Sequence, residues 1–222
     1  MSHEVAPLEV LRLGRLPYRA ALELQHRMVE DRLAGRCADR FVFVEHEPVI
    51  TLGRGFRGAR PEIPGVEVVE VERGGEATYH GPGQLVAYPI LLLSEPERDL
   101  HRVLHALEEA IIESISPLMI CGVRVNGATG VWVEHRGAMR KVASLGIAVR
   151  RWVTFHGLAL NVSTDLRGFE GFHPCGFGSE VMASLEGILG APVDRAALED
   201  RLAAAAASRL RRALAPEGAC VR

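Results

Sequence analysis

The stretch RGGEATYHGPGQLVAYPI, residues 73–90, joins a glycine-rich segment to the start of a long apolar run. The run continues from Leu85 to Leu93, and its length predicts a buried strand. Because glycine lets main-chain amides approach a ligand and adopt positive φ angles, we expect residues 73–84 to form a wall of a binding pocket. Arg73 and His80 would supply its polar contacts. The alternative is a tight turn with a capping histidine, since glycine-rich turns are common.

The segments on either side of this stretch show a mixture of helix and strand patterns. Apolar residues at spacings of three and four predict helices at 17–34, 97–116 and 194–214. Short β-branched and aromatic runs predict strands at 41–45, 49–52, 66–71, 122–125, 131–134, 142–149 and 152–162. The strands come in groups with helices between the groups. This order predicts an α+β fold, a mixed and mostly antiparallel sheet with flanking helices, in a single domain over residues 1–222.

The composition excludes several classes of function. The chain has 222 residues, of which 48% are hydrophobic, so it can bury one substantial core. Its formal charge of -2 provides no positive field that would hold a nucleic-acid backbone. The opening MSHEVAPLEV lacks a basic segment followed by an apolar one, and no apolar run approaches the roughly 20 residues of a membrane helix. We therefore expect a cytoplasmic protein without nucleic-acid or membrane partners. We also expect a monomer, although none of these sequence features bears on the oligomeric state.

Lysine is unusually rare in this chain. Among its 26 basic residues, Lys141 is the only lysine, and all the others are arginine. Arginine stays charged at any accessible pH, whereas a lysine ammonium can give up its proton, so a single remaining lysine indicates proton chemistry. A coding bias that spared one lysine by chance is the alternative.

The four cysteines must each be considered separately, because no C-x-x-C pair indicates a disulfide scaffold or a zinc site. Cys121 fits inside a predicted strand, and Cys220 lies in the terminal tail. Cys175 lies in HPCGFG, between a proline and a glycine, and outside any amphipathic pattern that would bury it. This setting suits a nucleophile whose thiolate is favoured by a neighbouring cation, although free cysteines also occur as small hydrophobic residues.

Two further patterns have ordinary explanations. GRGFRG, residues 53–58, matches the dinucleotide fingerprint, but the prolines that follow prevent the helix which that motif needs. The segment is better interpreted as a loop whose Arg54, Arg57 and Arg60 either meet an acidic partner or are solvated. His156 lies inside an apolar strand pattern, where a histidine is more often a core residue than a catalyst. We keep it only as a candidate for lining the pocket.

Four blocks together resemble the octanoyl or lipoyl protein transferases that act on acyl carrier protein. The blocks are residues 73–90, KVASLGIA at 141–148, HGLALNV at 156–162 and PCG at 174–176. They occur in the family's order and span about half of the chain. Members of this family share the catalytic fold of biotin and lipoate protein ligases, so the resemblance implies that fold here. Glu76 stands where the family often has glutamine.

The resemblance also implies a site and a reaction. An acyl thioester would form on Cys175, beside Lys141. The pocket for the acyl chain and the carrier arm would comprise Arg73, Gly74, Gly75, Glu76, Ala77, Thr78, Tyr79, His80, Ser144, Leu145, Gly146, Gly157, Leu158 and Ala159. The octanoyl donor would be acyl carrier protein, and the acceptors would be the apo lipoyl domains of 2-oxoacid dehydrogenases and the glycine cleavage H protein. No ATP, metal or other cofactor is expected, because the thioester supplies the energy for amide formation.

Three other classes of function share parts of this pattern. A Cys/His hydrolase would use Cys175 with His80 or His156 and release free acid. An ATP-dependent lipoate or biotin ligase would form an adenylate and would not need Cys175. A non-catalytic binder of lipoyl domains would form no covalent adduct. The HGPGQ and PCG blocks together favour acyl transfer over all three.

Overall fold

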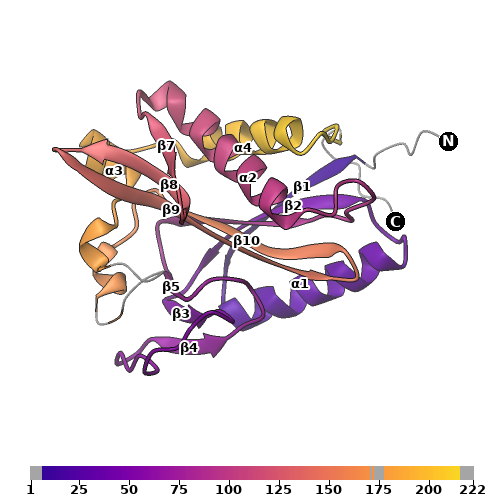
Figure 1. The fold of residues 1–222 in the computed structure, drawn as a ribbon, viewed down its shortest axis with the longest axis horizontal. Coiled ribbons are helices and arrows are strands. Elements are labelled where there is room, and N and C mark those ends of the chain that lie inside the picture. The colour runs from indigo at the N-terminus through magenta and orange to yellow at the C-terminus, as the bar shows by residue number, and fades with distance from the viewer. Residues whose placement is uncertain (1–6, 171, 173–177, 216–222) are drawn as a thin grey trace.

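The main sheet is mixed and mostly antiparallel, as predicted (Figure 1). The computed structural model of the chain describes residues 7–170, 172 and 178–215. Within these residues the sheet has seven strands, which from one edge to the other are β1 (Leu8–Leu16), β2 (Asp39–His46), β6 (Gln84–Ile90), β10 (Val153–Asn161), β9 (Ala138–Arg150), β8 (Ala128–His135) and β7 (Gly122–Val125). β1 and β2 pair in parallel, and each of the other neighbouring pairs is antiparallel.

A second, smaller sheet lies beside the start of the first helix (Figure 1). Its strand order is β4 (Glu67–Glu70), β3 (Val49–Leu52) and β5 (Ala77–His80), with β3 parallel to β4 and antiparallel to β5. Tyr18 packs against Val49 and Val69 of this sheet. The two sheets therefore meet near the N-terminal end of that helix.

Helices cover both faces of the main sheet (Figure 1). α2 (Leu100–Ile115) and α4 (Arg195–Arg209) pack on one face, where they enclose the larger hydrophobic core. α1 (Tyr18–Leu33) covers the other face and contacts β6 and β10. Asp99 caps the N-terminus of α2, because its carboxylate accepts hydrogen bonds from two main-chain amides of the first turn. The apolar stripe of α2 faces the sheet. The short α3 (Leu185–Leu189) precedes α4. No helix in the described part of the chain is long and apolar enough to cross a membrane.

Three features differ from the sequence prediction. β1 and β5 were not predicted as strands, and Cys121 is exposed and precedes β7 instead of lying inside a strand. The last long helix ends at Arg209, before the predicted 214, because the chain turns back and pairs with β1. The main-chain N–H of Leu8 donates to the carbonyl oxygen of Ala213 at 2.7 Å. Residues 53–58 form turns without a helix, as predicted.

Candidate active site

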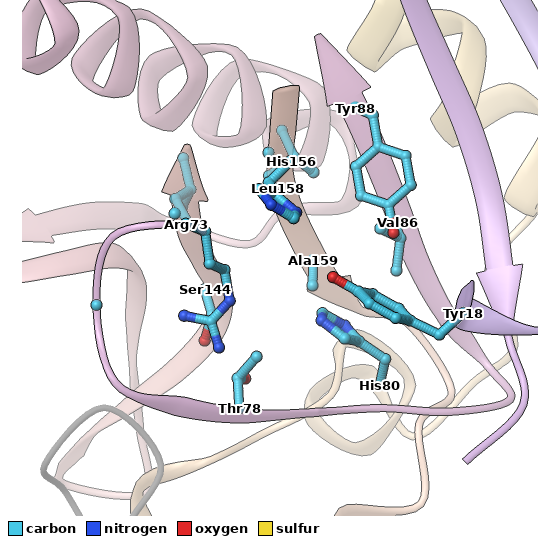
Figure 2. A pocket seen from close by; sticks show the side chains of 14 residues that line it. Tyr18, Arg73, Thr78, His80, Val86, Tyr88, Ser144, His156, Leu158 and Ala159 are labelled. Carbon is cyan, nitrogen blue, oxygen red and sulfur yellow. The ribbon is translucent and has the colours of Figure 1, made fainter. Parts of the chain in front are cut away.

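A pocket lies where the small sheet, the main sheet and the start of α1 meet (Figure 2). It contains about 450 Å³ of space between the atoms, part of which is open to solvent. Apolar and polar side chains both line it. The lining residues are Tyr18, Arg73, Gly75, Thr78, His80, Val86, Tyr88, Ser144, Leu145, Gly146, His156, Gly157, Leu158 and Ala159.

Most of the residues that the resemblance assigned to the acyl pocket line this pocket, but Gly74, Glu76, Ala77 and Tyr79 do not. The difference within β5 follows from strand alternation, which points successive side chains to opposite faces. Thr78 and His80 face the pocket, whereas Tyr79 packs against Phe169 with ring centroids 5.4 Å apart. Gly74 instead holds the wall in place, because its N–H donates to the carbonyl oxygen of Ile147 at 3.1 Å.

The pocket is also lined by residues that were not predicted from the sequence. Tyr18 enters from the first turn of α1, and Val86 and Tyr88 come from β6. β6 is buried on both faces, so no alternation of polar and apolar residues marked which of its side chains face a ligand. His156, kept only as a candidate, does line the pocket and has a positive φ of 57°.

The GRGFRG loop braces the pocket wall. The main-chain N–H of Arg54 donates to the carbonyl oxygen of Arg73 at 3.0 Å, and that of Gly55 donates to the carbonyl oxygen of Gly75 at 2.9 Å. A Cβ atom added at Gly53 would lie 2.4 Å from the Gly75 oxygen, so only glycine permits this approach. The glycine-rich loop at 53–58 therefore supports the glycine-rich pocket wall at 73–84.

Burial keeps the histidines of the pocket region uncharged at neutral pH. Desolvation, with smaller contributions from His46 and Arg73, lowers the pKa of His80 to about 3. Desolvation and the Arg73 guanidinium lower the pKa of His156 to about 4, although Glu72 acts in the opposite direction. The pKa of His46 is also about 4, chiefly because of burial, and its Nε2 lies 2.6 Å from the Tyr88 hydroxyl. The histidines thus provide hydrogen-bonding groups without charge.

Arg73 provides a buried positive charge in the pocket wall. Its guanidinium donates to the carbonyl oxygen of Thr51 at 2.7 Å and to that of Gly74 at 3.0 Å. Ser144 adds a buried hydroxyl, which has no hydrogen-bond partner among the described residues. The pocket thus combines an apolar lining with groups that can bind a carbonyl oxygen.

Lys141 lies on β9, three residues before Ser144, and only 1% of it is exposed. Its Nζ is 5.4 Å from the centroid of the Trp132 ring. Its main chain forms a parallel bridge with Met182, and its carbonyl oxygen accepts a hydrogen bond from the N–H of Ala183 at 3.0 Å. Lys141 is thus held beside the segment that follows the PCG block.

Cys175, with the rest of residues 173–177, lies outside the described residues. The described residues on either side of it meet in one hydrophobic cluster. Phe169, before the PCG block, and Met182, after it, both pack in the cluster that contains Tyr79 of β5. The chain on both sides of Cys175 is therefore attached near β5 and Lys141.

A chain of buried hydrogen bonds joins the pocket to the same segment. His80 Nδ1 lies 2.8 Å from Oε1 of Gln84, and Nε2 of Gln84 donates to Oδ1 of Asn161 at 2.9 Å. Nδ2 of Asn161 in turn donates to the carbonyl oxygen of Ala183 at 3.1 Å. The HGPGQ and HGLALNV blocks thereby contact the residues that pair with Lys141. Among the described side chains, no group of three or more His, Cys, Asp or Glu is arranged to hold a metal ion.

The fold and the pocket define a class of protein. Residues 17–207 match the family model for the lipoyl protein ligase A/B catalytic domain, and the chain belongs to this family. Solved structures show the same fold. A bipartite lipoate protein ligase from Thermoplasma acidophilum superimposes with a TM-score of 0.72 at 17% identity, covering 96% of this chain and 87% of that one. A biotin protein ligase from Aquifex aeolicus superimposes with a TM-score of 0.57 at 14% identity, covering 92% of this chain and 70% of that one.

Sequence relatives narrow the class to acyltransferases of the octanoyltransferase type. The octanoyltransferase of Syntrophotalea carbinolica is 45% identical over 195 residues, which cover 88% of this chain and 90% of the relative. That of Thermosynechococcus vestitus is 48% identical over 178 residues, which cover 78% and 77%. The predicted resemblance and the predicted fold are both confirmed.

Proposed function

We propose that the protein transfers an octanoyl or lipoyl group from acyl carrier protein to a lysine of apo lipoyl domains through a thioester on Cys175. The observation that carries this proposal is the position of Lys141. The only lysine of the chain is buried, lies on the strand that lines the pocket, and is hydrogen-bonded to the segment that follows Cys175. The acceptors would be the lipoyl domains of 2-oxoacid dehydrogenases and the glycine cleavage H protein, and the enzyme would act as a monomer.

In the first half of the reaction the Cys175 thiolate attacks the carbonyl carbon of the donor thioester. A nearby Lys141 ammonium favours the thiolate, because opposite charges stabilise each other. The new carbon–sulfur bond forms as the bond to the pantetheine sulfur breaks. Lys141 then gives a proton to the departing sulfur, so that pantetheine leaves as a thiol and Lys141 becomes neutral.

In the second half the lysine amine of the lipoyl domain attacks the acyl group on Cys175. The carbon–nitrogen bond of the amide forms, the bond to the Cys175 sulfur breaks, and the thiolate returns. Neutral Lys141 accepts the proton that the amine loses, which restores its ammonium. The two proton transfers balance over one cycle, and the thioester supplies the driving force without ATP.

The pocket would hold the acyl chain during both steps. Val86, Leu145 and Leu158 offer apolar contacts, and the uncharged histidines add no further positive charge to that of Arg73. Main-chain amides at 144–146 or in the PCG block would stabilise the tetrahedral oxyanion, each contributing about 3 kcal/mol.

Intact mass spectrometry tests the proposal directly. After incubation with octanoyl acyl carrier protein, we expect an octanoyl mass increment on Cys175, which disappears when an apo lipoyl domain is added. Cys175→Ala should form no adduct. Lys141→Arg keeps the charge but cannot accept a proton, so it should lose most turnover. Full activity in Lys141→Arg would refute the role of Lys141 in proton transfer.

The same experiment separates the competing functions. A Cys/His hydrolase would release free octanoate when no lipoyl domain is present. A ligase would act only with ATP and would tolerate Cys175→Ala. A binding protein would retain the lipoyl domain without any mass increment.

A further inference from the structure

A bulge in β9 determines on which face of the main sheet Lys141 lies. The side chains of a strand alternate between faces, so Lys141 would be expected on the same face as Ala143, which packs in the core beneath α2. The pairing of β8 with β9 departs from this alternation. Val131 pairs with Ala143, but the next residue, Trp132, pairs with Lys141, so Val142 has no partner of its own.

This bulge places Lys141 on the opposite face. Residues that pair directly across two antiparallel strands share a face, so Lys141 lies on the face of Trp132, in agreement with the 5.4 Å between Nζ and the Trp132 ring. Ser144, adjacent to Ala143, also lies on this face, and it lines the pocket. Without the extra residue, the amine would point into the core beneath α2.

Gly130 provides the space in which the Lys141 side chain lies. It is two residues before Trp132 on β8 and therefore shares its face. A Cβ atom at Gly130 would lie 2.5 Å from Lys141 Cε, 3.2 Å from its Nζ and 2.5 Å from the carbonyl oxygen of Ala143. The φ angle of Gly130, 136°, is also one that other residues rarely adopt. Any side chain at this position would displace the amine.

Glu108 of α2 holds the main chain at Gly130. The N–H of Gly130 donates to Glu108 Oε1 at 2.8 Å, and only 4% of Glu108 is exposed. A buried carboxyl group needs such a partner, and its removal would leave the Gly130 amide without one. This hydrogen bond connects α2 to the strand that borders Lys141.

We propose that Gly130, held by Glu108, is a positioning residue for acyl transfer, because it fixes where the Lys141 amine lies on the pocket face of the sheet. This inference rests on the proposed role of Lys141. Gly130 has no role in binding the acyl chain, since it does not line the pocket. Its replacement should therefore affect the chemical steps and leave donor binding intact.

The single lysine makes a specific test possible. Protein grown with lysine labelled with ¹³C at Cε gives one lysine resonance, which belongs to Lys141. We expect Gly130→Ala to shift this resonance, because the methyl group displaces the amine relative to the Trp132 ring. We also expect kcat to fall by about 100-fold, as is typical of a displaced catalytic group, with KM for octanoyl acyl carrier protein unchanged.

Gly127→Ala is the matched control. Gly127, in the turn before β8, has a positive φ of 77° and no atom within 4 Å of an added Cβ. Its replacement imposes similar backbone strain without touching Lys141, so the resonance and kcat should remain as in the unaltered protein. If Gly130→Ala moves neither the resonance nor kcat further than Gly127→Ala does, the proposal is wrong. A shifted resonance with an unchanged kcat would also overturn it.

A second pair of variants tests the proposal if Gly130→Ala does not fold. Glu108→Gln keeps an oxygen that can accept the Gly130 hydrogen bond, whereas Glu108→Ala removes it. We expect Glu108→Ala to shift the Lys141 resonance and lower kcat, and Glu108→Gln to restore both; equal effects in the two variants would contradict the proposal. The position of the resonance does not depend on activity, so it tests the positioning by Gly130 alone. The role of Lys141 is tested separately: if Lys141→Ala still transfers octanoyl groups at the rate of the unaltered protein, the proposed role of the lysine is wrong.

Discussion

At the scale of single residues, the histidines make the stability of this protein depend on pH. His46, His80 and His156 have pKa values of about 4, 3 and 4, all below the ordinary value of 6.5. Between these values and pH 6.5 the unfolded chain binds protons that the folded protein does not. A lower pH in this window therefore favours the unfolded state.

We expect the free energy of unfolding to fall as the pH decreases from about 6.5 to about 4.5, by up to about 1.4 kcal/mol per pH unit for each histidine. Urea denaturation at several pH values measures this slope. Above about pH 7.5 all three histidines are neutral in both states, so their contribution should be constant there. His46→Gln removes one titrating group and should make the dependence shallower, whereas the same slope in both proteins would contradict the assignment for His46.

Some pocket residues could be predicted from the sequence because they lie in a segment of unusual composition, and others could not. Thr78 and His80 lie in a glycine-rich stretch whose composition marks it, but the same stretch also includes Ala77 and Tyr79, which face away. Their direction became clear only once β5 was seen to be a strand. Tyr18 carried no such signal, because an aromatic residue in the first turn of a helix usually belongs to a core.

At the scale of elements, the hydrogen bonds of Asn161 join the end of β10 to Ala183, beside Lys141. Ala183, in the described segment that follows residue 177, is attached at this point to strands that are themselves buried. Since catalytic groups must be held within a fraction of an ångström, we expect this connection to matter for turnover as well as for stability.

Asn161→Ala should lower the free energy of unfolding by about 1–3 kcal/mol, because it leaves the buried amide of Gln84 without one of its partners. Hydrogen exchange at the amide of Ala183, followed by mass spectrometry, should become faster. Asn126→Ala, in the exposed turn between β7 and β8, is the control and should leave both quantities unchanged. Unchanged exchange at Ala183 in Asn161→Ala would show that the hydrogen bond does not hold this segment.

The helices and strands that could be predicted from the sequence were those whose apolar residues recur at a regular spacing. The helices α1 and α2 and the strands β8, β9 and β10 each have an apolar pattern that is long enough to identify them. β1 did not, because Gly14 and an irregular register after Arg12 interrupt its alternation. The bulge at Val142 could not be predicted from the sequence either, because Val142 and Ala143 are both apolar and fit an unbroken strand.

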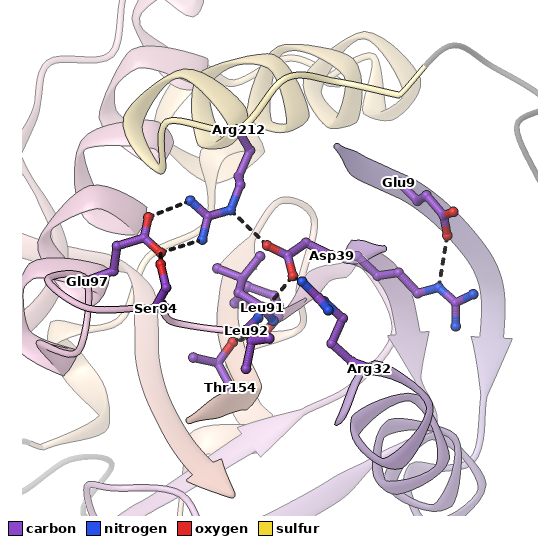
Figure 3. Close-up of polar contacts among 11 residues, drawn as sticks. Glu9, Arg32, Asp39, Leu91, Leu92, Ser94, Glu97, Thr154 and Arg212 are labelled. Atoms are coloured by element: carbon purple, nitrogen blue, oxygen red, sulfur yellow. Dashed lines mark hydrogen bonds and ion pairs between the residues drawn. The ribbon is translucent and has the colours of Figure 1, made fainter. Parts of the chain in front are cut away.

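At the scale of the whole molecule, a buried ionic cluster attaches the C-terminal segment to the main sheet (Figure 3). Arg212 donates from Nε to Asp39 Oδ2 at 2.8 Å and from Nη1 to Glu97 Oε1 at 2.7 Å. The other oxygen of Asp39 accepts a hydrogen bond from Arg32 at 2.7 Å. Asp39 is 1% exposed, so its charge depends on both arginines. The cluster connects α1, β2 and the residues after α4.

Arg212→Met should lower the free energy of unfolding by about 3 kcal/mol, because it removes a partner from a buried carboxylate. Chemical denaturation monitored by circular dichroism measures the change. Arg211→Met, at the exposed neighbouring position, should change stability by no more than about 0.5 kcal/mol. Similar losses in the two variants would show that the cluster does not anchor the C-terminal segment.

The burial of Lys141 has a consequence for the outer surface of the protein. With its only lysine 1% exposed and arginine at every other Lys or Arg position, the described surface carries no side-chain amine. A guanidinium group stays protonated and does not react with thioesters under physiological conditions. An activated fatty acid that approaches this surface finds no side-chain amine on the enzyme that could intercept it. On the described surface, the incoming lysine of the acceptor therefore has no side-chain amine as a competitor.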